Sequence, residues 1–355
     1  MKKIILVLPT LSQGGAERVM SELANEWANT GHHVLLVLLV KSTRFYKLDS
    51  NVELIDLAFD NEGKKFVKFV DSLNLLLRLR NLIKCNNPDF VLSFMDKYNV
   101  LTLIASFFLN VNIFVSDRNN PKEIIPKEIE ILRKLLYRNA KGIIAQTSLA
   151  KEILFSKTKN SNIKVIPNPI KNFSSISNFK KEKIILNVGR LVPEKGQHYL
   201  IEVMSHLKHE QWKLIILGDG PLREVLQQQI DDLNLNENVF LMGSVKNVEE
   251  WLNRSSIFAF TSISEGFPNA LIEAMVAGLA CVSFDCDAGP RDVLQDNING
   301  YLIPLHDITA FKDVVQKLMG DDFLRNKIGL EARKVSNSLS TKKIAQEYLN
   351  FCVTK

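Results

Sequence analysis

Two carboxylates flank a short turn in the second half of the chain, where they could bind sugar hydroxyls beside a phosphate. The segment SEGFPNALIEAM places Glu265 just before a Phe-Pro-Asn turn and Glu273 after it. We expect a helix over 270–277 with Asn269 as its N-cap, so backbone N–H groups at Ala270 would form an anion site. Because a carboxylate accepts hydrogen bonds from vicinal hydroxyls, one glutamate would bind a ribose and the other a transferred sugar. Taken alone, Glu273 is better explained as a first-turn acidic residue favoured by the helix dipole.

Two cations occupy another turn in the same half. The segment VGRLVPEKGQHYL places Arg190 and Lys195 between an expected strand, Ile184–Val188, and a helix. A pair of cations at the carboxyl end of a strand suits the neutralisation of a diphosphate. Each residue alone would be an ordinary exposed charge, but the two in one loop favour the phosphate-binding interpretation.

A glycine pair follows the first apolar run, in LSQGGAERVM. Gly14 and Gly15 would let the backbone approach a ligand closely, and the helix expected from residue 16 would direct its N–H groups toward that ligand. A lone Gly-Gly is equally typical of a plain strand-to-helix turn. Glu17 and Arg18 are interpreted as a solvated or interface pair, not as direct ligands.

The elements that must position these residues alternate between short apolar runs and longer helical patterns. This order predicts an α/β protein with parallel, doubly wound sheets, whose ligands bind at the carboxyl ends of the strands. The expected strands are Ile4–Leu8, Val34–Val40, Phe90–Ser93, Ile113–Ser116, Gly142–Ala145, Ile184–Val188, Lys213–Leu217, Val239–Leu241, Ile257–Phe260 and Ala280–Phe284. The strand pattern restarts after the segment IPNPI. We therefore expect two Rossmann-like domains, 1–168 and 169–339, with a last helix over 340–355 that packs back on the first.

Charge is distributed unevenly along the 355 residues, whose net charge is +6. Residues 1–170 hold 24 Lys/Arg against 16 Asp/Glu, and the remainder is close to neutral. This asymmetry predicts an anionic surface or substrate for the first domain, and the lack of a basic-aromatic recognition motif argues against nucleic acid. Unpaired cysteines, a start without a cleavable leader and apolar runs too short to span a bilayer favour a cytoplasmic protein with at most peripheral membrane contact.

Five motifs in order resemble family 4 of the glycosyltransferases, which are retaining enzymes of the GT-B fold. The motifs are GGAER (14–18), GRLVPEKG (189–196), GDGPLRE (218–224), the Glu-x7-Glu element and NGYLIP (299–304). The resemblance covers nearly the whole chain. It is strongest to bacterial enzymes that extend lipid-linked oligosaccharides, including N-acetylgalactosaminyltransferases. The segment FYKLDSNVEL (45–54) of this chain also resembles that group.

The resemblance implies a role for each matching residue toward a UDP-sugar donor. Gly14 and Gly15 would lie against the donor phosphates and sugar, Arg190 and Lys195 would bind the diphosphate, and Glu265 would contact sugar hydroxyls. Glu273 would bind the ribose. The remaining donor contacts would come from Val245 near the uracil and from Phe267, Asn269, Ala270 and Leu271 at the helix start.

Arg118 departs from the family pattern. Many relatives carry a histidine in this loop, whereas this chain reads VSDRNNP. Arginine stays protonated and cannot serve as a general base, but it could neutralise a developing phosphate or an acceptor diphosphate. A structural Asp117–Arg118 pair is an equally good interpretation.

Two basic, partly apolar segments suggest contact with an anionic membrane. Lys64–Lys84 carries Lys64, Lys65, Lys68, Arg78, Arg80 and Lys84, and Ile129–Lys141 carries Arg133, Lys134, Arg138 and Lys141. They could lie on lipid headgroups or bind an acceptor diphosphate, or they could be ordinary helices with charged outer faces.

The resemblance implies transfer of a hexose or N-acetylhexosamine from a UDP-sugar to a polyprenyl-diphosphate-linked saccharide, with retention of anomeric configuration. It implies neither a cofactor nor a metal, and Asp285-Cys286-Asp287 is not interpreted as a metal-binding Asp-x-Asp because it follows a strand of the second domain. Two alternatives stay open: a sugar-nucleotide epimerase of the same architecture, and a non-catalytic subunit that binds nucleotide sugars.

Overall fold

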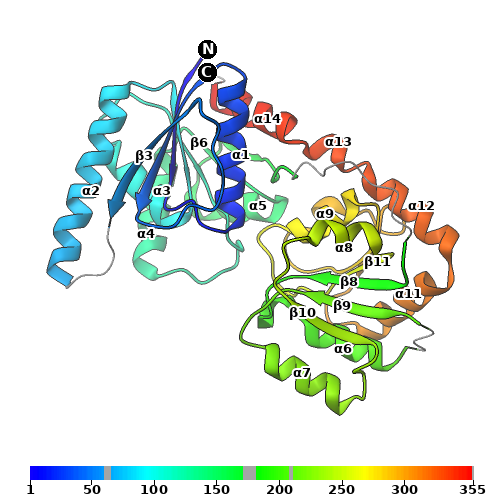
Figure 1. Ribbon diagram of the computed structural model, residues 1–355. Helices are drawn as coiled ribbons and strands as arrows, with labels where there is room; N and C mark the ends of the chain where they lie inside the picture. The colour runs from blue at the N-terminus through cyan, green and yellow to red at the C-terminus, as the bar shows by residue number, and fades with distance from the viewer. Residues whose placement is uncertain (60–64, 171–180, 208–210, 354–355) are drawn as a thin grey trace. The chain divides into compact units, whose positions relative to one another are not determined.

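The computed structural model describes residues 1–59, 65–170, 181–207 and 211–353, with side chains in the second helix described from Ser72 onward. The chain divides into two compact units (Figure 1). Met1–Pro169 and Ser340–Lys355 form the first unit, and Ile170–Leu339 forms the second. The division falls one residue from the boundary expected between 168 and 169.

The first unit contains a seven-stranded sheet in the order β3-β2-β1-β4-β5-β6-β7, and neighbouring strands pair in parallel. Its strands are β1 Lys3–Leu8, β2 His33–Val40, β3 Val52–Phe59, β4 Phe90–Phe94, β5 Ile113–Ser116, β6 Gly142–Ala145 and β7 Ile163–Val165. The central strands are apolar throughout because helices cover both faces of a parallel sheet. These helices are α1 Gly15–Asn29, α2 Lys65–Asn86, α3 Asp96–Ala105, α4 Lys127–Leu136, α5 Ser148–Thr158 and α14 Thr341–Val353.

The helix α14 belongs to the first unit, although the whole second unit separates it from the rest of that unit in the sequence. Figure 1 shows α14 beside α1, and the buried indole of Trp27 donates to the Ala345 carbonyl at 3.0 Å. Tyr348 and Cys352 on α14 are buried as well. The first unit therefore completes its core with residues from the far end of the chain.

The second unit contains a six-stranded parallel sheet in the order β10-β9-β8-β11-β12-β13. Its strands are β8 Ile184–Val188, β9 Lys213–Leu217, β10 Val239–Gly243, β11 Ile257–Phe260, β12 Ala280–Phe284 and β13 Tyr301–Ile303. Its helices are α6 Gln197–Ser205, α7 Arg223–Asp232, α8 Val248–Arg254, α9 Asn269–Val276, α10 Pro290–Val293, α11 Ile308–Gly320, α12 Asp322–Arg333 and α13 Ser336–Leu339. In both sheets the fourth strand of the unit lies beside the first, β4 beside β1 and β11 beside β8, as in Rossmann-like folds.

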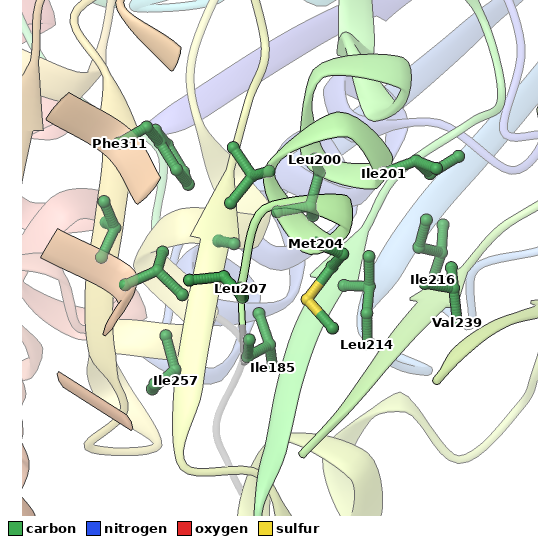
Figure 2. Packing of buried hydrophobic residues seen from close by; sticks show 14 of the residues in the cluster. Ile185, Leu200, Ile201, Met204, Leu207, Leu214, Ile216, Val239, Ile257 and Phe311 are labelled. Carbon is green, nitrogen blue, oxygen red and sulfur yellow. The ribbon is translucent and has the colours of Figure 1, made fainter. Parts of the chain in front are cut away.

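One face of the second sheet packs against α6 and α11. Figure 2 shows Leu200, Ile201 and Met204 of α6 over the strand residues Ile185 and Leu214. All five side chains are buried. This packing fixes the loop between β8 and α6, which carries the cations of the expected donor site.

The prediction of doubly wound parallel sheets is confirmed, and three strands were missed. β3 lies at a sheet edge, where only Val52 and Leu57 of its eight side chains are buried, so its apolar signal is diluted. β7 and β13 are each three residues long, too short for a pattern to be read from sequence. In the second unit, α9 begins at Asn269 with Pro268 as its N-cap, so the prediction that Asn269 caps the helix was wrong.

Candidate functional site

Lys195 and Glu265 form the centre of the candidate site in the second unit. Lys195 Nζ donates to Glu265 Oε1 at 2.5 Å, although 70 residues separate them. The Glu265 side chain is 8% exposed and that of Lys195 is 23% exposed. A carboxylate buried to this degree is stable in its charged form only when it is paired, so the lysine is held in place by its partner.

Two neighbouring loops are joined by backbone contacts that bring this pair together. The Ile263 N–H donates to the Glu194 carbonyl at 2.9 Å, and the Thr261 hydroxyl donates to the Lys195 carbonyl at 3.2 Å. Gly196 has a positive φ of 60°, and a Cβ there would clash with the Thr261 carbonyl. Glycine is therefore required at 196 both for its backbone conformation and for the close approach of the β11 loop.

The GDGPLRE motif supports the loop that carries Arg190. A Cβ at Gly218 would clash with the Gly189 carbonyl, and one at Gly220 would lie 2.5 Å from the Leu191 carbonyl. The Leu191 N–H also donates to the Asp219 carbonyl at 3.0 Å. These two glycines thus let the loops after β8 and β9 pack backbone to backbone, while the Arg190 side chain is exposed.

The start of α9 places the other expected donor contacts. Phe267 and Leu271 are buried, whereas Asn269, Ala270 and Glu273 are half-buried. The Asn269 N–H donates to the Phe267 carbonyl at 3.0 Å, so this N–H group is already used within the turn.

Val245 follows β10 and is half-buried. It packs against the same apolar cluster as Ala270, a cluster that includes Leu271. The structure therefore brings the expected uracil-contacting residue and the start of α9 onto one cluster of the second unit.

The Asp285-Cys286-Asp287 segment leaves β12 near this centre. Arg291 donates to both oxygens of Asp285, at 2.8 and 2.5 Å, while Cys286 is fully buried. Burial, and after it the charge of Glu265, raises the pKa of the Cys286 thiol to about 12. The thiol is therefore neutral at physiological pH and lies within electrostatic range of the Lys195–Glu265 pair.

The glycine turn of the first unit is shaped by a carboxylate from its own helix. Glu17 is buried, accepts a hydrogen bond from the Thr10 hydroxyl at 3.2 Å, and fills the space where a Cβ at Gly14 would lie. Arg18 instead pairs with Glu22 at 3.0 Å, so the interpretation of Glu17 and Arg18 as a pair was wrong. Gly14 is required by Glu17, and Gly15 is the first residue of α1.

Arg118 is held by three aromatic and polar neighbours in the first unit. Its guanidinium donates to Asn168 Oδ1 at 2.5 Å and to the Tyr348 hydroxyl at 2.6 Å, and it lies 3.7 Å from the Phe94 ring centroid. Burial lowers the pKa of Arg118 from its usual value. The interpretation of Asp117 and Arg118 as a structural pair was wrong, because Arg118 bonds to Asn168 and to Tyr348 of α14. The expected role of Arg118 toward a phosphate stays a prediction.

Asp117 pairs with Arg133 of α4. The distance from Arg133 Nη2 to Asp117 Oδ2 is 2.9 Å, and Arg133 Nη1 lies 3.5 Å from Asp96 Oδ2. Tyr137 donates to Asp117 at 2.7 Å, and all of these side chains except that of Asp117 are buried. Burial, followed by the Asp117 charge, raises the pKa of Asp96 to about 8. Arg133 was expected on a membrane-facing surface, and this expectation was wrong.

The other basic residues of segments 64–84 and 129–141 differ in their exposure and in their hydrogen bonds. Arg78 donates to the Leu57 carbonyl, and Arg80 donates to the carbonyls of Ala105 and Phe107. Lys64, Lys65 and Lys68 lie outside the residues whose side chains are described. Among the described side chains of the two segments, the exposed basic residues are Arg78, Lys84, Lys134, Arg138 and Lys141. None of the helices among the described residues has the length and apolar character required to cross a bilayer.

The sequence did not indicate the residues that hydrogen-bond to the backbone of the strands and loops around the expected site residues. Asn187 on β8 is buried and donates to the Ala259 carbonyl of β11 at 2.8 Å, and Thr261 binds the Lys195 backbone. Tyr46 donates to the Gly14 carbonyl at 2.9 Å. Nothing in the local sequence marks Asn187 or Thr261, but Tyr46 stands in the FYKLDSNVEL pattern that the resemblance had already singled out.

Comparisons with known proteins identify the family to which both halves of the chain are similar. Residues 13–171 match the model described as Glycosyltransferase Family 4, and residues 170–335 match the model described as Glycosyl transferases group 1. A Campylobacter jejuni α-1,4-N-acetyl-D-galactosaminyltransferase, named for a diNAcBac-PP-undecaprenol substrate, is 26% identical over 98% of both chains. The amylovoran biosynthesis glycosyltransferase AmsD of Erwinia amylovora is 26% identical over 91% of this chain and 92% of its own length.

Solved structures show the same fold. A glycosyltransferase from Rickettsia africae superposes with a TM-score of 0.85 at 21% identity, over 99% of this chain and 97% of that one. HepE of Anabaena, solved with UDP and glucose, superposes with a TM-score of 0.83 at 18% identity over the whole of both chains. Both likenesses show the GT-B fold. With its two halves matched in order by the two family models, the chain belongs to the family 4, group 1 glycosyltransferases.

Proposed function

We propose that this protein is a retaining glycosyltransferase that uses a UDP-sugar. The donor would be a hexose or an N-acetylhexosamine such as N-acetylgalactosamine, and the acceptor a polyprenyl-diphosphate-linked saccharide in bacterial surface-polysaccharide or glycan assembly. The observation that carries the proposal is the Lys195–Glu265 pair, a buried carboxylate and a cation held together at the carboxyl edge of the second sheet.

The pair offers one group for each half of a nucleotide sugar. An ammonium group has three N–H donors, and one of them is directed at Glu265, so two remain for phosphate oxygens. Glu265 has a second carboxylate oxygen that suits a sugar hydroxyl. Arg190 is exposed on the adjoining loop, where its planar guanidinium could bind the same diphosphate in bidentate fashion.

The mechanism follows from where negative charge develops. As the bond between the anomeric carbon and the diphosphate breaks, charge builds on the phosphate oxygens. Lys195, Arg190 and the N-terminus of α9 would stabilise that charge, and groups that are already in position need little reorganisation during the reaction. These fixed cations are why we propose that transfer needs no metal or cofactor.

The acceptor is proposed from the relatives. The Campylobacter jejuni enzyme is named for an undecaprenol diphosphate saccharide, and a second enzyme of that organism, 27% identical over 99% of both chains, is named for a similar one. The basic first half of this chain suits a substrate that carries a diphosphate.

Membrane contact is proposed for the exposed face of α4. Ile131 and Leu135 lie one helical turn apart and are 57% and 55% exposed, and Ile124 just before the helix is 97% exposed. Lys127 and Lys134 are exposed on the same helix. Apolar side chains flanked by lysines suit adsorption to anionic lipid, which would place the protein at the cytoplasmic face of the inner membrane.

The test is UDP release from a panel of UDP-sugars, with and without a polyprenyl-diphosphate saccharide. Transfer of one sugar, seen by product mass and shown by NMR to keep the donor's anomeric configuration, supports the proposal. Interconversion of the UDP-sugar without acceptor would instead establish an epimerase, and tight binding without turnover a non-catalytic subunit. Inversion at the anomeric carbon would refute the retaining mechanism.

A further inference from the structure

An exposed aromatic ring lies beside the glycine turn of the first unit. β2 ends at Val40, so segment 41–47 (KSTRFYK) leaves the sheet at its carboxyl edge, the edge at which β1 also ends. The Phe45 side chain in this segment is 60% exposed. A single exposed phenylalanine is common on protein surfaces. Whether Phe45 binds a ligand therefore depends on its backbone contacts, its position in the sheet and the charges near it.

The backbone around Phe45 is fastened to the glycine turn. The Phe45 N–H donates to the Leu11 carbonyl at 2.9 Å, and the Tyr46 hydroxyl donates to the Gly14 carbonyl at 2.9 Å. The two rings pack edge to face with centroids 5.0 Å apart. The Phe45 ring is therefore presented to solvent from a backbone that these contacts hold in place.

The segment is tied to α1 as well. The Asn25 side chain donates to the Lys47 carbonyl at 3.2 Å and accepts from the Asp49 N–H at 2.8 Å. The segment is thus anchored just beyond the ring too, an arrangement that lowers the entropy cost when a ligand packs on it.

Position distinguishes Phe45 from the other described exposed phenylalanines of the first unit. Phe107 and Phe108 precede β5, at the amino edge of the sheet, and Phe155 lies near the end of α5. Phe45 is the one of these four at the carboxyl edge, where ligands of doubly wound sheets bind.

The charges around Phe45 suit an anionic saccharide. Lys41 and Lys47 are exposed on either side of it in the sequence, while Arg44 pairs with Asp56 at 3.3 Å. Arg118, expected at first to meet an acceptor diphosphate, is committed to Asn168 and Tyr348. Lys41 and Lys47 are exposed cations of this edge that suit that task.

We propose that Phe45 stacks against a pyranose ring of the acceptor saccharide, while the ammonium groups of Lys41 and Lys47 neutralise its diphosphate. The inference rests on the proposed function and names the residues of its acceptor subsite. The face of an aromatic ring carries partial negative charge and attracts the polarised C–H groups of a sugar. Tyr46 is a positioning residue, because it acts through the glycine turn.

The experiment compares Phe45→Ala and Phe45→Trp with the wild type, using a short-chain polyprenyl diphosphate that carries an N-acetylhexosamine saccharide. Phe45→Ala should raise the acceptor KM about tenfold and leave the KM for UDP-sugar and the acceptor-free release of UDP unchanged. Phe45→Trp should keep the acceptor KM within about twofold and shift its fluorescence when acceptor is added. Phe155→Ala, at a residue 52% exposed, is the matched control and should behave as wild type.

An unchanged acceptor KM in Phe45→Ala would overturn the inference, as would a raised KM for UDP-sugar alone. If the wild type transfers sugar to no acceptor, the proposed function fails, and the fluorescence of Phe45→Trp then decides this inference separately. A shift on adding the lipid saccharide would uphold the binding site, and no shift would refute it. The variant Lys41→Ala/Lys47→Ala should weaken that binding more at low salt than at high salt.

Discussion

Lys195 Nζ lies 2.5 Å from Glu265 Oε1, so the cation proposed to meet the donor phosphates already has an anionic partner. When the donor binds, the Lys195 ammonium group must therefore share its hydrogen bonds between the Glu265 carboxylate and a donor phosphate. This relationship makes the two residues separable by mutation, because Lys195 is proposed to stabilise the leaving group, whereas Glu265 restrains the lysine.

Replacement of Lys195 by methionine should lower kcat/KM about 100-fold. The methionine keeps the apolar stem and removes the charge that stabilises developing negative charge on the diphosphate. Steady-state UDP release measures the effect. Lys213→Met is the control, since Lys213 is an exposed lysine at the start of β9 in the same unit. Equal rates in the two variants would contradict the assigned role.

Replacement of Glu265 by glutamine should separate affinity for UDP from sugar transfer. The lysine then loses its internal counter-charge, so UDP should bind a few-fold more tightly, while kcat should fall at least about tenfold as the sugar contact is lost. Calorimetric titration with UDP and with UDP-sugar distinguishes the two effects. Glu194→Gln, an exposed glutamate in the adjoining turn, should change neither. Weaker binding of UDP to Glu265→Gln would contradict this account.

Replacement of Arg118 by leucine should lower stability and leave the acceptor KM of the folded protein unchanged. The change leaves the Tyr348 hydroxyl and Asn168 Oδ1 without their charged donor, at a cost of about 1–3 kcal/mol. Tyr348→Phe should show a smaller loss of the same kind. Urea unfolding and acceptor kinetics give the two readouts. A raised acceptor KM at wild-type stability would instead support a role for Arg118 in binding the acceptor diphosphate.

Stability of the first unit should fall as pH rises from about 5 to 8. The pKa of Asp96 is raised to about 8, so the folded protein keeps a proton that the unfolded chain releases near pH 4. Where the unfolded state binds fewer protons, stability declines with pH, here by at most about 1.4 kcal/mol per unit. Asp96→Asn should remove this slope in urea unfolding followed between pH 5 and 8. An identical slope in both proteins would show that Asp96 titrates normally.

Removal of divalent metal should leave activity unchanged within about twofold. Under the proposed mechanism, Arg190 and Lys195 would supply the positive charge that a metal provides in other transferases. The assay is UDP release after treatment with EDTA. Loss of activity that manganese restores would show that these cations are insufficient.

Much of the fold could be predicted because parallel strands buried on both faces are apolar throughout. β5, β6, β8, β9, β11 and β12 were found with the expected bounds for this reason. The edge strand β3 was not found, since only two of its eight side chains are buried. A strand can therefore be predicted from its local sequence only where its side chains are buried on both faces of the sheet.

The site could be predicted in part. Lys195 and Glu265 were both proposed from their residue types and turns, but their direct pairing across 70 residues was not, because it depends on how two loops pack. Arg118 shows the opposite case. Its neighbours Asn168 and Tyr348 come from distant segments, so nothing near residue 118 could reveal that the side chain was already occupied.

The return of α14 to the first unit has a consequence for biosynthesis. Trp27 and Phe94 are synthesised before the second unit, yet their contacts with Ala345 and Tyr348 require α14, which is synthesised after that unit. The second unit can therefore fold while the first unit still lacks the helix that contacts Trp27 and Phe94.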